Sequence, residues 1–370
     1  MKDTPKNRTG GARGILRKLL ILLAVYFVMF LIVFYSRELS NGIKNGINVA
    51  LNLVVPSMFL FMILSNLIIR SELRDIISRP FRFLAKWVFR IPGRETAIVV
   101  LSLVGGYPVG AKLLGDAVQR GEMSPQMAER MLCYCVNCGP AFLISGVGTA
   151  IFGSPKLGVY LYLSQIVACL FTGFLNSFGM HKHTSAHSPV SQPEPHTGGA
   201  VLLVNSVNDA VRSLGVICGF VVAFSACMPL MDLLLQRLNP GWAAVMQGLL
   251  EVTNGCNALA DYTAPNRILL ATVFTAFGGI CVHLQVCAML KSTGIRMGRF
   301  FLFRLPYTLV SVGVVELLLR LSPDTVSTIS YNHAVRQELY SVSPAAAIFL
   351  LFLAIMLLFF SRKSDTIEQK

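Results

Sequence analysis

Charged residues are scarce in this sequence of 370 residues: only 14% are Asp, Glu, Lys or Arg, whereas 54% are hydrophobic. Soluble domains carry about 25% charged residues, so the composition excludes an ordinary soluble globular domain. Acidic residues are the rarer sign, with 18 Asp and Glu against 32 Lys and Arg. A formal charge of +14 would suggest nucleic acid in a soluble chain, but here the basic residues cluster between apolar runs. We therefore interpret the charge as topogenic and expect no nucleic-acid partner.

The sequence also lacks the short motifs of common enzymes. It has no His-Glu-X-X-His, no Gly-X-Ser-X-Gly and no complete phosphate loop with Gly-Lys-Ser or Gly-Lys-Thr. There are nine cysteines, but Cys133, Cys135 and Cys138 have no matching second cluster to complete a zinc site. We interpret the cysteines as small buried hydrophobic residues and expect no enzyme activity, no metal and no resident cofactor.

Long apolar runs are what the chain does contain, and each can cross a hydrocarbon core about 30 Å thick. They lie near 16–36, 47–69, 157–179, 213–235, 300–319 and 344–361. Two further crossings, about 124–152 and about 267–290, are interrupted by glycine, proline or asparagine. The first run is longer than the apolar region of a signal peptide and lacks a clear cleavage site. The sequence predicts an all-α polytopic membrane protein with about eight transmembrane helices and two re-entrant hairpins, near 96–120 and 241–262.

Basic residues flank most of these runs on one side only. Residues 1–18 hold six Lys and Arg against one acidic residue, and Lys291, Arg296 and Arg299 follow a later span. The positive-inside rule therefore predicts that both termini lie in the cytoplasm of a bacterial cell membrane. Residues 70–94 interleave seven basic residues with aromatic ones, which predicts a helix on the anionic inner membrane surface rather than an RNA-binding arm.

The predicted elements divide the chain into six parts. These are a basic N-terminus with the first transmembrane helix (1–45), a first repeat (46–180), a polar cytoplasmic linker (181–199), a second repeat (200–320), an external loop (321–342) and a last transmembrane helix with its tail (343–370). Both repeats run span, hairpin, broken span, span. Because three crossings separate their first spans, the second repeat has the opposite orientation, so the sequence predicts an inverted repeat.

Four predicted breaks within the apolar segments form the candidate site. They are Gly105–Gly110, Asn137–Pro140, Thr253–Asn257 and Gly278–Gly279. Unpaired backbone groups are costly in hydrocarbon, so such breaks persist where they are buried in protein or line a polar cavity. The N-terminus of a half-helix presents free amides and about half a positive charge. We therefore predict that the breaks meet near the bilayer midplane and bind a small anionic or carbonyl-rich molecule.

The candidate substrate-binding residues come from these breaks and the turns that follow them. They are Gly106, Pro108, Gly110, Lys112, Asn137, Gly139, Pro140, Thr253, Asn254, Asn257, Gly278, Gly279, His283 and Gln285. Lys112 would bind a carboxylate or form a structural ion pair, and the three asparagines would contact a planar ligand or cap helix ends. His283 and Gln285 cannot share one helical face, so at most one of them contacts substrate.

Two further ionisable residues have competing interpretations. Glu251 is the candidate for coupling to protons or sodium ions, and its alternatives are a pair with Lys112 or a place near the external surface. Arg304 is expected to be an interfacial anchor rather than a ligand.

Several motifs, in the right order, resemble the YlbJ-type sporulation integral membrane proteins of spore-forming Firmicutes. They are GlyGlyTyrProValGlyAlaLys at 105–112, ValAsnCysGlyProAlaPheLeuIle at 136–144, LeuGluValThrAsnGly at 250–255, AlaPheGlyGlyIleCysValHisLeuGln at 276–285 and ArgMetGlyArgPhePheLeuPheArg ending at Arg304. The resemblance covers about 45–320. Cys138, Cys256 and Cys281 depart from the pattern of that family.

The family belongs to the nucleoside-recognition or Gate group, which is similar in architecture to concentrative nucleoside transporters. The resemblance implies a secondary transporter of a small anionic solute, located in the outer forespore membrane. It implies export from the mother cell to the forespore, with dipicolinate as the suggested cargo. A nucleoside-type transporter and a non-transporting membrane scaffold for spore assembly are the alternatives. The expected partners are a small-molecule substrate and the lipid bilayer, and association into a homo-oligomer stays open.

Overall fold

The computed structural model describes residues 9–178, 199–235, 240–259, 262 and 266–322. All regular elements in these ranges are helices, which confirms the all-α prediction. Four helices are long and apolar enough to cross a membrane: Pro155–Ser177, Ala200–Leu233, Asn266–Met289 and Gly298–Leu321. The bent pair Lys18–Phe34 and Ser36–Asn52 would add a fifth span. The count of eight spans and the inverted relation of the repeats stay predictions, since the linker, the external loop and the last span lie almost wholly outside the described residues.

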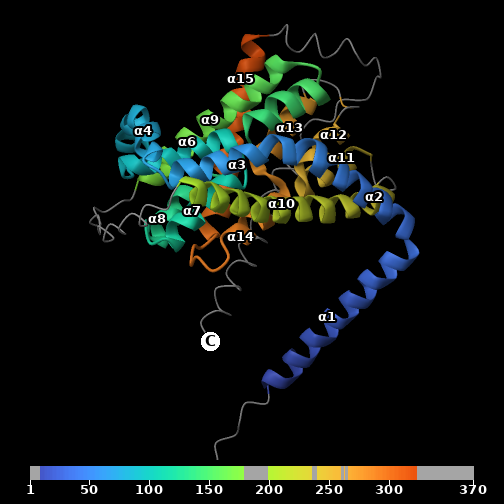
Figure 1. The fold of residues 1–370 in the computed structure, drawn as a ribbon. Coiled ribbons are helices and arrows are strands. Elements are labelled where there is room, and N and C mark those ends of the chain that lie inside the picture. The colour runs from blue at the N-terminus through green and yellow to red at the C-terminus, as the bar shows by residue number, and fades with distance from the viewer. Residues whose placement is uncertain (1–8, 179–198, 236–239, 260–261, 263–265, 323–370) are drawn as a thin grey trace, which may run out of the picture.

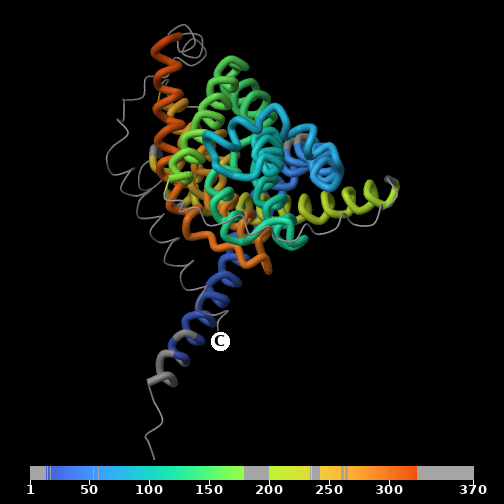
Figure 2. The backbone as a smooth tube through the Cα atoms, turned by 90° about the vertical axis from the view of Figure 1, so that its left-hand side faces the viewer, coloured from blue at the N-terminus to red at the C-terminus, as the bar shows by residue number. Residues whose placement is uncertain are grey.

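The first helix, α1 (Thr9–Phe34), extends away from the rest of the described fold (Figures 1 and 2). Most of its side chains after Leu16 are apolar and exposed, as expected for a helix surrounded by lipid. The chain then bends by 88° into α2 (Ser36–Val49), most of which lies between the predicted spans 16–36 and 47–69. Gly42 lets α2 approach α10 (Gly199–Leu235), because a Cβ on Gly42 would lie 2.4 Å from the Ser225 carbonyl oxygen. This tertiary contact explains why so polar a segment is helical.

The predicted span 47–69 is divided into a π-helical segment, η1 (Ala50–Val54), and α3 (Val55–Ile69). The basic segment that follows was predicted as one surface helix, and that prediction is wrong. It consists of α4 (Leu73–Ser78), η2 (Arg79–Phe81), α5 (Arg82–Leu84), η3 (Ala85–Phe89) and η4 (Gly93–Glu95). Pro80 and Pro92 remove backbone donors, and Arg90 takes a left-handed conformation with φ 50°. The Arg74 side chain is buried and binds Glu95 and Glu122, which folds the segment back onto the body.

The first hairpin and the two predicted spans after it follow the predicted order. They are α6 (Thr96–Gly105), α7 (Val109–Gln119), α8 (Pro125–Leu132), the π-helical η5 (Ala141–Ile151) and α9 (Pro155–Ser177). Ser124 caps α8 as expected, since its hydroxyl accepts from the Met127 amide at 3.3 Å. The break between α8 and η5 is longer than predicted, because the chain leaves the helix already at Cys133.

In the second half of the chain, the structure differs from the predicted elements at two places. The expected lead-in at 200–212 and the span at 213–235 form one continuous helix, α10. The elements after it are α11 (Pro240–Leu250), α12 (Val252–Ala258), α13 (Asn266–Phe277), α14 (Gly279–Met289) and α15 (Gly298–Leu321). The hairpin breaks at Glu251 rather than over Thr253–Asn257, which lies within α12. Its polar residues were assigned to a loop because asparagine and glycine favour turns, but capping by Glu251 starts the helix before them.

Candidate functional site

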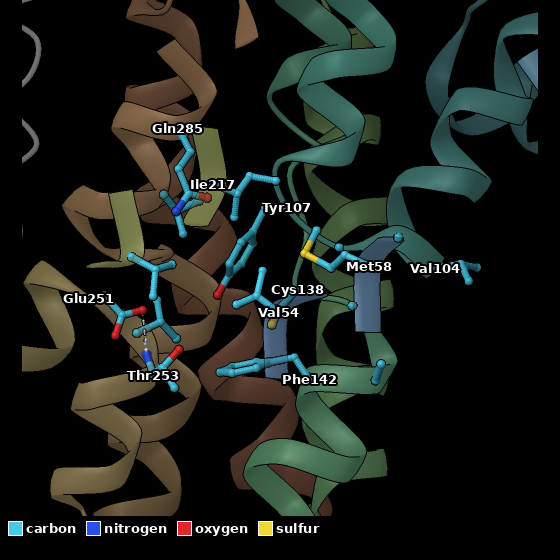
Figure 3. A pocket seen from close by; sticks show the side chains of 17 residues that line it. Val54, Met58, Val104, Tyr107, Cys138, Phe142, Ile217, Glu251, Thr253 and Gln285 are labelled. Carbon is cyan, nitrogen blue, oxygen red and sulfur yellow. Dashed lines mark hydrogen bonds between the residues drawn. The ribbon is translucent and has the colours of Figure 1, made fainter. Parts of the chain in front are cut away.

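One cavity is lined by residues from each of the four interrupted segments (Figure 3). The lining residues are Val54, Met58, Val104, Gly105, Gly106, Tyr107, Cys138, Gly139, Ala141, Phe142, Ile217, Val221, Glu251, Val252, Thr253, Val282 and Gln285. Its volume is about 80 Å³, counted as the space open to the centre of a water-sized sphere. One water molecule needs about 10–15 Å³ on that measure, so the cavity has room for several. Residues of three of the four predicted breaks therefore line one space, and the segment after the fourth, Gly278–Gly279, contributes Val282 and Gln285.

Glycines allow the first hairpin to pack directly against the break after α8. Gly106 has φ 74°, and a Cβ there would lie 2.8 Å from the Gly139 amide nitrogen. A Cβ on Gly110 would lie 1.7 Å from the Cys135 carbonyl oxygen, so only glycine fits in this geometry. The glycine-rich motif thus brings two irregular backbone segments together at the wall of the cavity.

Glu251 contributes the one charged side chain among the lining residues. It is only 4% exposed, and it caps the N-terminus of α12. Its carboxylate accepts hydrogen bonds from the Thr253 amide at 3.0 Å and the Asn254 amide at 2.8 Å. The Asn254 side chain donates a third hydrogen bond to it at 2.9 Å and a further one to Ser225 at 3.1 Å. These donors stabilise a buried negative charge at the edge of the cavity.

The remaining polar lining groups are neutral. The Tyr107 hydroxyl is buried, and it forms no hydrogen bond within the part of the chain that the structure describes. Figure 3 shows this hydroxyl directed toward the side of the cavity where Glu251 and Thr253 lie. Gln285 donates to the Cys281 sulfur at 3.3 Å and lies on the α14 side of the cavity. Because a buried hydroxyl without a partner is costly, Tyr107 is suited to bind water or a solute.

Two side chains of α15 that do not line the cavity bind the break after α8, and one of them also binds the end of α13. Arg304 is only 2% exposed, so the expectation of an interfacial anchor is wrong. Its guanidinium donates to the carbonyls of Ala276, at 3.0 Å, and Val136. Tyr307 donates its hydroxyl hydrogen to the Asn137 side-chain oxygen at 2.7 Å. These contacts fix the backbone on both sides of the site.

Lys112 lies apart from the cavity and does not pair with Glu251. Its ammonium group contacts the Asp116 carboxylate at 2.6 Å, one helical turn further along α7. The structural ion pair that the sequence analysis kept as an alternative is therefore present. Lys112 lines a second, more polar cavity beside α10 and α14.

Several other predicted site residues are not among those that line the cavity. They are Pro108, Gly110, Asn137, Pro140, Asn254, Gly278 and Gly279. Asn137 has no exposed surface, and its amide donates to Ser102 at 3.3 Å and to the Tyr134 carbonyl at 2.9 Å. Gly278 supports the break between α13 and α14 with a left-handed φ of 93°. Asn257 is exposed, so a place for it in this cavity is wrong.

His283 and Gln285 separate as the helical geometry requires. Gln285 lines the cavity, whereas His283 packs among the rings of Phe277, Phe300 and Phe301. The His283 Nδ1 lies 2.5 Å from the Gly279 carbonyl oxygen, so this side chain supports the break rather than facing the cavity.

Most of the apolar lining and one polar group were not predicted from the sequence. Tyr107 lies inside the glycine-rich motif, and its place beside a predicted break was the signal that could have identified it. Ile217 and Val221 come from α10, where nothing in an apolar run distinguishes a cavity-facing residue from a lipid-facing one. In the described ranges, no group of three or more His, Cys, Asp or Glu side chains is placed to hold a metal ion.

Comparison with known proteins gives one informative similarity. The chain is 24% identical over 300 residues to the sporulation integral membrane protein YlbJ of Bacillus subtilis (strain 168), covering 72% of this chain and 74% of that protein. No family model matches the chain. No solved structure matches it either.

Proposed function

We propose that this chain, which is similar to the sporulation integral membrane protein YlbJ, is a secondary transporter that moves a small anionic solute through the cavity between its interrupted helices. The observation that carries the proposal is the meeting of four interrupted helical segments around Tyr107, Glu251 and Gln285. Irregular backbone inside a membrane protein is tolerated where it lines a polar cavity. A membrane scaffold that moves no solute would not require these segments to line a common cavity.

The chemistry of the lining favours a solute that binds together with a proton or a cation. Glu251 and a carboxylate solute would repel each other in a cavity of low dielectric constant. A proton or a sodium ion on Glu251 removes that repulsion and couples its own movement to that of the solute. Tyr107 and Gln285 supply neutral hydrogen-bond donors for the carboxylate oxygens. The proposed cargo is dipicolinate, carried from the mother cell to the forespore.

A nucleoside-type cargo is the second candidate, and Glu251 is the specific observation that favours it. A neutral solute with N–H or O–H groups can donate to this carboxylate without any charge compensation. The rings of Tyr107 and Phe142, which also line the cavity, can contact a planar base.

Ligand-dependent thermal stabilisation of the purified protein distinguishes these cargoes. A solute that binds the folded state raises its stability by RT ln(1 + [L]/Kd), about 2.7 kcal/mol at one hundred times Kd. We expect dipicolinate to raise Tm and nucleosides to leave it unchanged, with the reverse result identifying the nucleoside-type transporter. Tyr107→Phe should weaken binding about tenfold, because one hydrogen bond to a charged group is lost. The matched control, Tyr26→Phe on exposed α1, should bind normally. If neither class of solute raises Tm, the transporter proposal fails.

Uptake into proteoliposomes tests the role of Glu251. A proton or sodium gradient should stimulate wild-type uptake of dipicolinate, and Glu251→Gln should abolish the stimulation while binding persists. Glu316→Gln is the matched control, since Glu316 is exposed and pairs with Arg320 at the end of α15. Equal stimulation of the wild type and Glu251→Gln would refute the coupling role and leave the cavity itself in place.

A further inference from the structure

A second cavity lies beside the first and is much more polar. It is lined by Lys112, Asp116, Gln119, Asp209, Arg212, Ser213, Val216, Ala288, Met289 and Lys291, and we call it the charged vestibule. Its volume is about 350 Å³ on the same measure as the first cavity. The lining comes from α7, α10 and the end of α14.

The two cavities follow the same helices. On α10, Ser213 lines the vestibule and Ile217, one turn later on the same face, lines the first cavity. On α14, Met289 lines the vestibule and Gln285, one turn earlier, lines the first cavity. One helical turn is about 5.4 Å, so the two cavities are placed end to end along these helices. The vestibule is at the end that carries Lys291, which the positive-inside rule assigns to the cytoplasm.

The acids of the vestibule are already paired, whereas two of its cations are not. Asp116 binds Lys112 at 2.6 Å, and Asp209 binds Arg70 at 2.6 Å. Arg212 and Lys291 are exposed, and neither forms an ion pair within the described ranges. The vestibule thus has uncompensated positive charge inside a concave space, where the surrounding protein focuses the field.

We infer that the charged vestibule is the access site through which a small carboxylate- or phosphate-bearing anion reaches the first cavity from the Lys291 side. Arg212 and Lys291 capture the anion. The Lys112–Asp116 pair carries no net charge and completes the wall. This inference deepens the proposed transport function, because it assigns the charge of the cargo from residues outside the first cavity.

The field of the vestibule can be measured without any transport assay. Val216 is 40% exposed and lines the vestibule, so a thiol in Val216→Cys reports on the local potential. The full-length variant in nanodiscs of neutral phosphatidylcholine is labelled with an anionic and a cationic methanethiosulfonate of similar size. Peptide mass spectrometry reads the rate at residue 216, so the native cysteines remain in place. We expect the anionic reagent to react several-fold faster at this residue, normalised to the rates of the two reagents with a free thiol.

Charge-neutralised backgrounds give the matched comparison. Arg212→Gln together with Lys291→Gln should lower the ratio of anionic to cationic rates about threefold or more, and added salt should have less effect on it. Lys156→Gln, an exposed lysine at the start of α9, should leave the ratio unchanged. An equal ratio in all three backgrounds would overturn the inference, because no charge-selective vestibule would then exist.

Protection experiments identify the ligand. Dipicolinate should slow the labelling of residue 216 in neutral nanodiscs, whereas its uncharged dimethanol analogue should not. If labelling of residue 216 is slowed only when the nanodisc contains phosphatidylglycerol, the vestibule binds a lipid headgroup. That result would overturn the solute assignment. Charge-selective labelling and protection by dipicolinate, without uptake of any solute into vesicles, would support the anion site in the vestibule. The same result would contradict the proposed transport function.

Discussion

The Arg304 guanidinium donates a hydrogen bond to the main-chain carbonyl of Ala276, 3.0 Å away, just before α13 ends. A second hydrogen bond runs to the carbonyl of Val136, in the break after α8. One side chain of α15 therefore satisfies a carbonyl near the end of α13 and a carbonyl of the irregular segment after α8. The rings of Phe300 and Tyr307, with centroids 4.7 and 4.8 Å from the guanidinium carbon, also stabilise its charge.

Arg304→Met should lower the free energy of unfolding by about 2–5 kcal/mol, because two buried carbonyls lose their donor at about 1–3 kcal/mol each. Relief from burying a charge offsets part of this cost. Arg304→Lys, which keeps the charge but not the fork of donors, should be intermediate. Thermal unfolding in detergent measures the order of these variants. Arg320→Met, at the exposed end of the same helix, is the control, and a Tm drop as large as that of Arg304→Met would contradict the assignment.

Tyr307→Phe should lower the free energy of unfolding by about 1–3 kcal/mol. The change removes the hydroxyl that donates to Asn137 at 2.7 Å and leaves a buried amide oxygen unsatisfied. Denaturation of purified protein should show the loss, while Tyr26→Phe on α1 should behave like the wild type. The double variant Tyr307→Phe with Asn137→Ala should lose less stability than the sum of the two single variants, since both remove the same hydrogen bond.

Gly255→Ala should destabilise the second hairpin strongly. A Cβ on Gly255 would lie 2.0 Å from the Gly248 Cα atom, so the backbones of α11 and α12 would have to separate. Gly215→Ala on α10 is the matched control, because a Cβ at that position meets nothing within 4 Å. The control should gain about 0.4–1 kcal/mol from lower entropy of the unfolded chain. Equal Tm values for the two variants would refute the close packing of the hairpin.

The hairpin at Glu251 shows how far the sequence could predict the site. The alternation of apolar runs with glycine, proline and asparagine predicted that the chain is interrupted there, since these residues disfavour continuous helices. It could not predict that the interruption lies at Glu251 itself. Whether Asn254 belongs to a loop or to the first turn of a helix depends on the hydrogen bonds from its backbone and side chain to the carboxylate. Those bonds exist only in the folded hairpin.

The charged residues show a different limit. In the sequence, Arg74 and Arg304 look like any other basic residue beside an apolar run, yet both side chains are buried. Their partners, Glu122 for Arg74 and Val136 for Arg304, are distant in the sequence. Sequence periodicity describes which face of one helix is apolar, but not which distant backbone or carboxylate lies opposite. Spans were therefore easier to predict than the groups that connect them.

The carboxyl group of Glu122, which pairs with Arg74 and Arg120, gives a prediction about the pH dependence of stability. Burial opposes ionisation of Glu122, but hydrogen bonds and charge from Arg120 and Arg74 outweigh it and lower the pKa of this carboxyl below its ordinary value. A lowered pKa in the folded state means that the pair stabilises the protein fully above the unfolded pKa, about 4.3. The stabilisation is lost as the pH falls through the folded pKa. Unfolding measured from pH 7 to pH 3 should therefore show a steeper loss for the wild type than for Glu122→Gln, and parallel curves would contradict the pairing.

Helix α10 contributes to both cavities without an interruption between Val216 and Ile217. Just after the first cavity's lining it is held against α2, where a Cβ on Gly46 would lie 2.8 Å from the Val222 Cα atom. If this unbroken helix rotated about the glycine contact, the lining that it gives to both cavities would move as one rigid unit. Both linings on α10 precede this contact, so the charged vestibule and the first cavity would widen or narrow together.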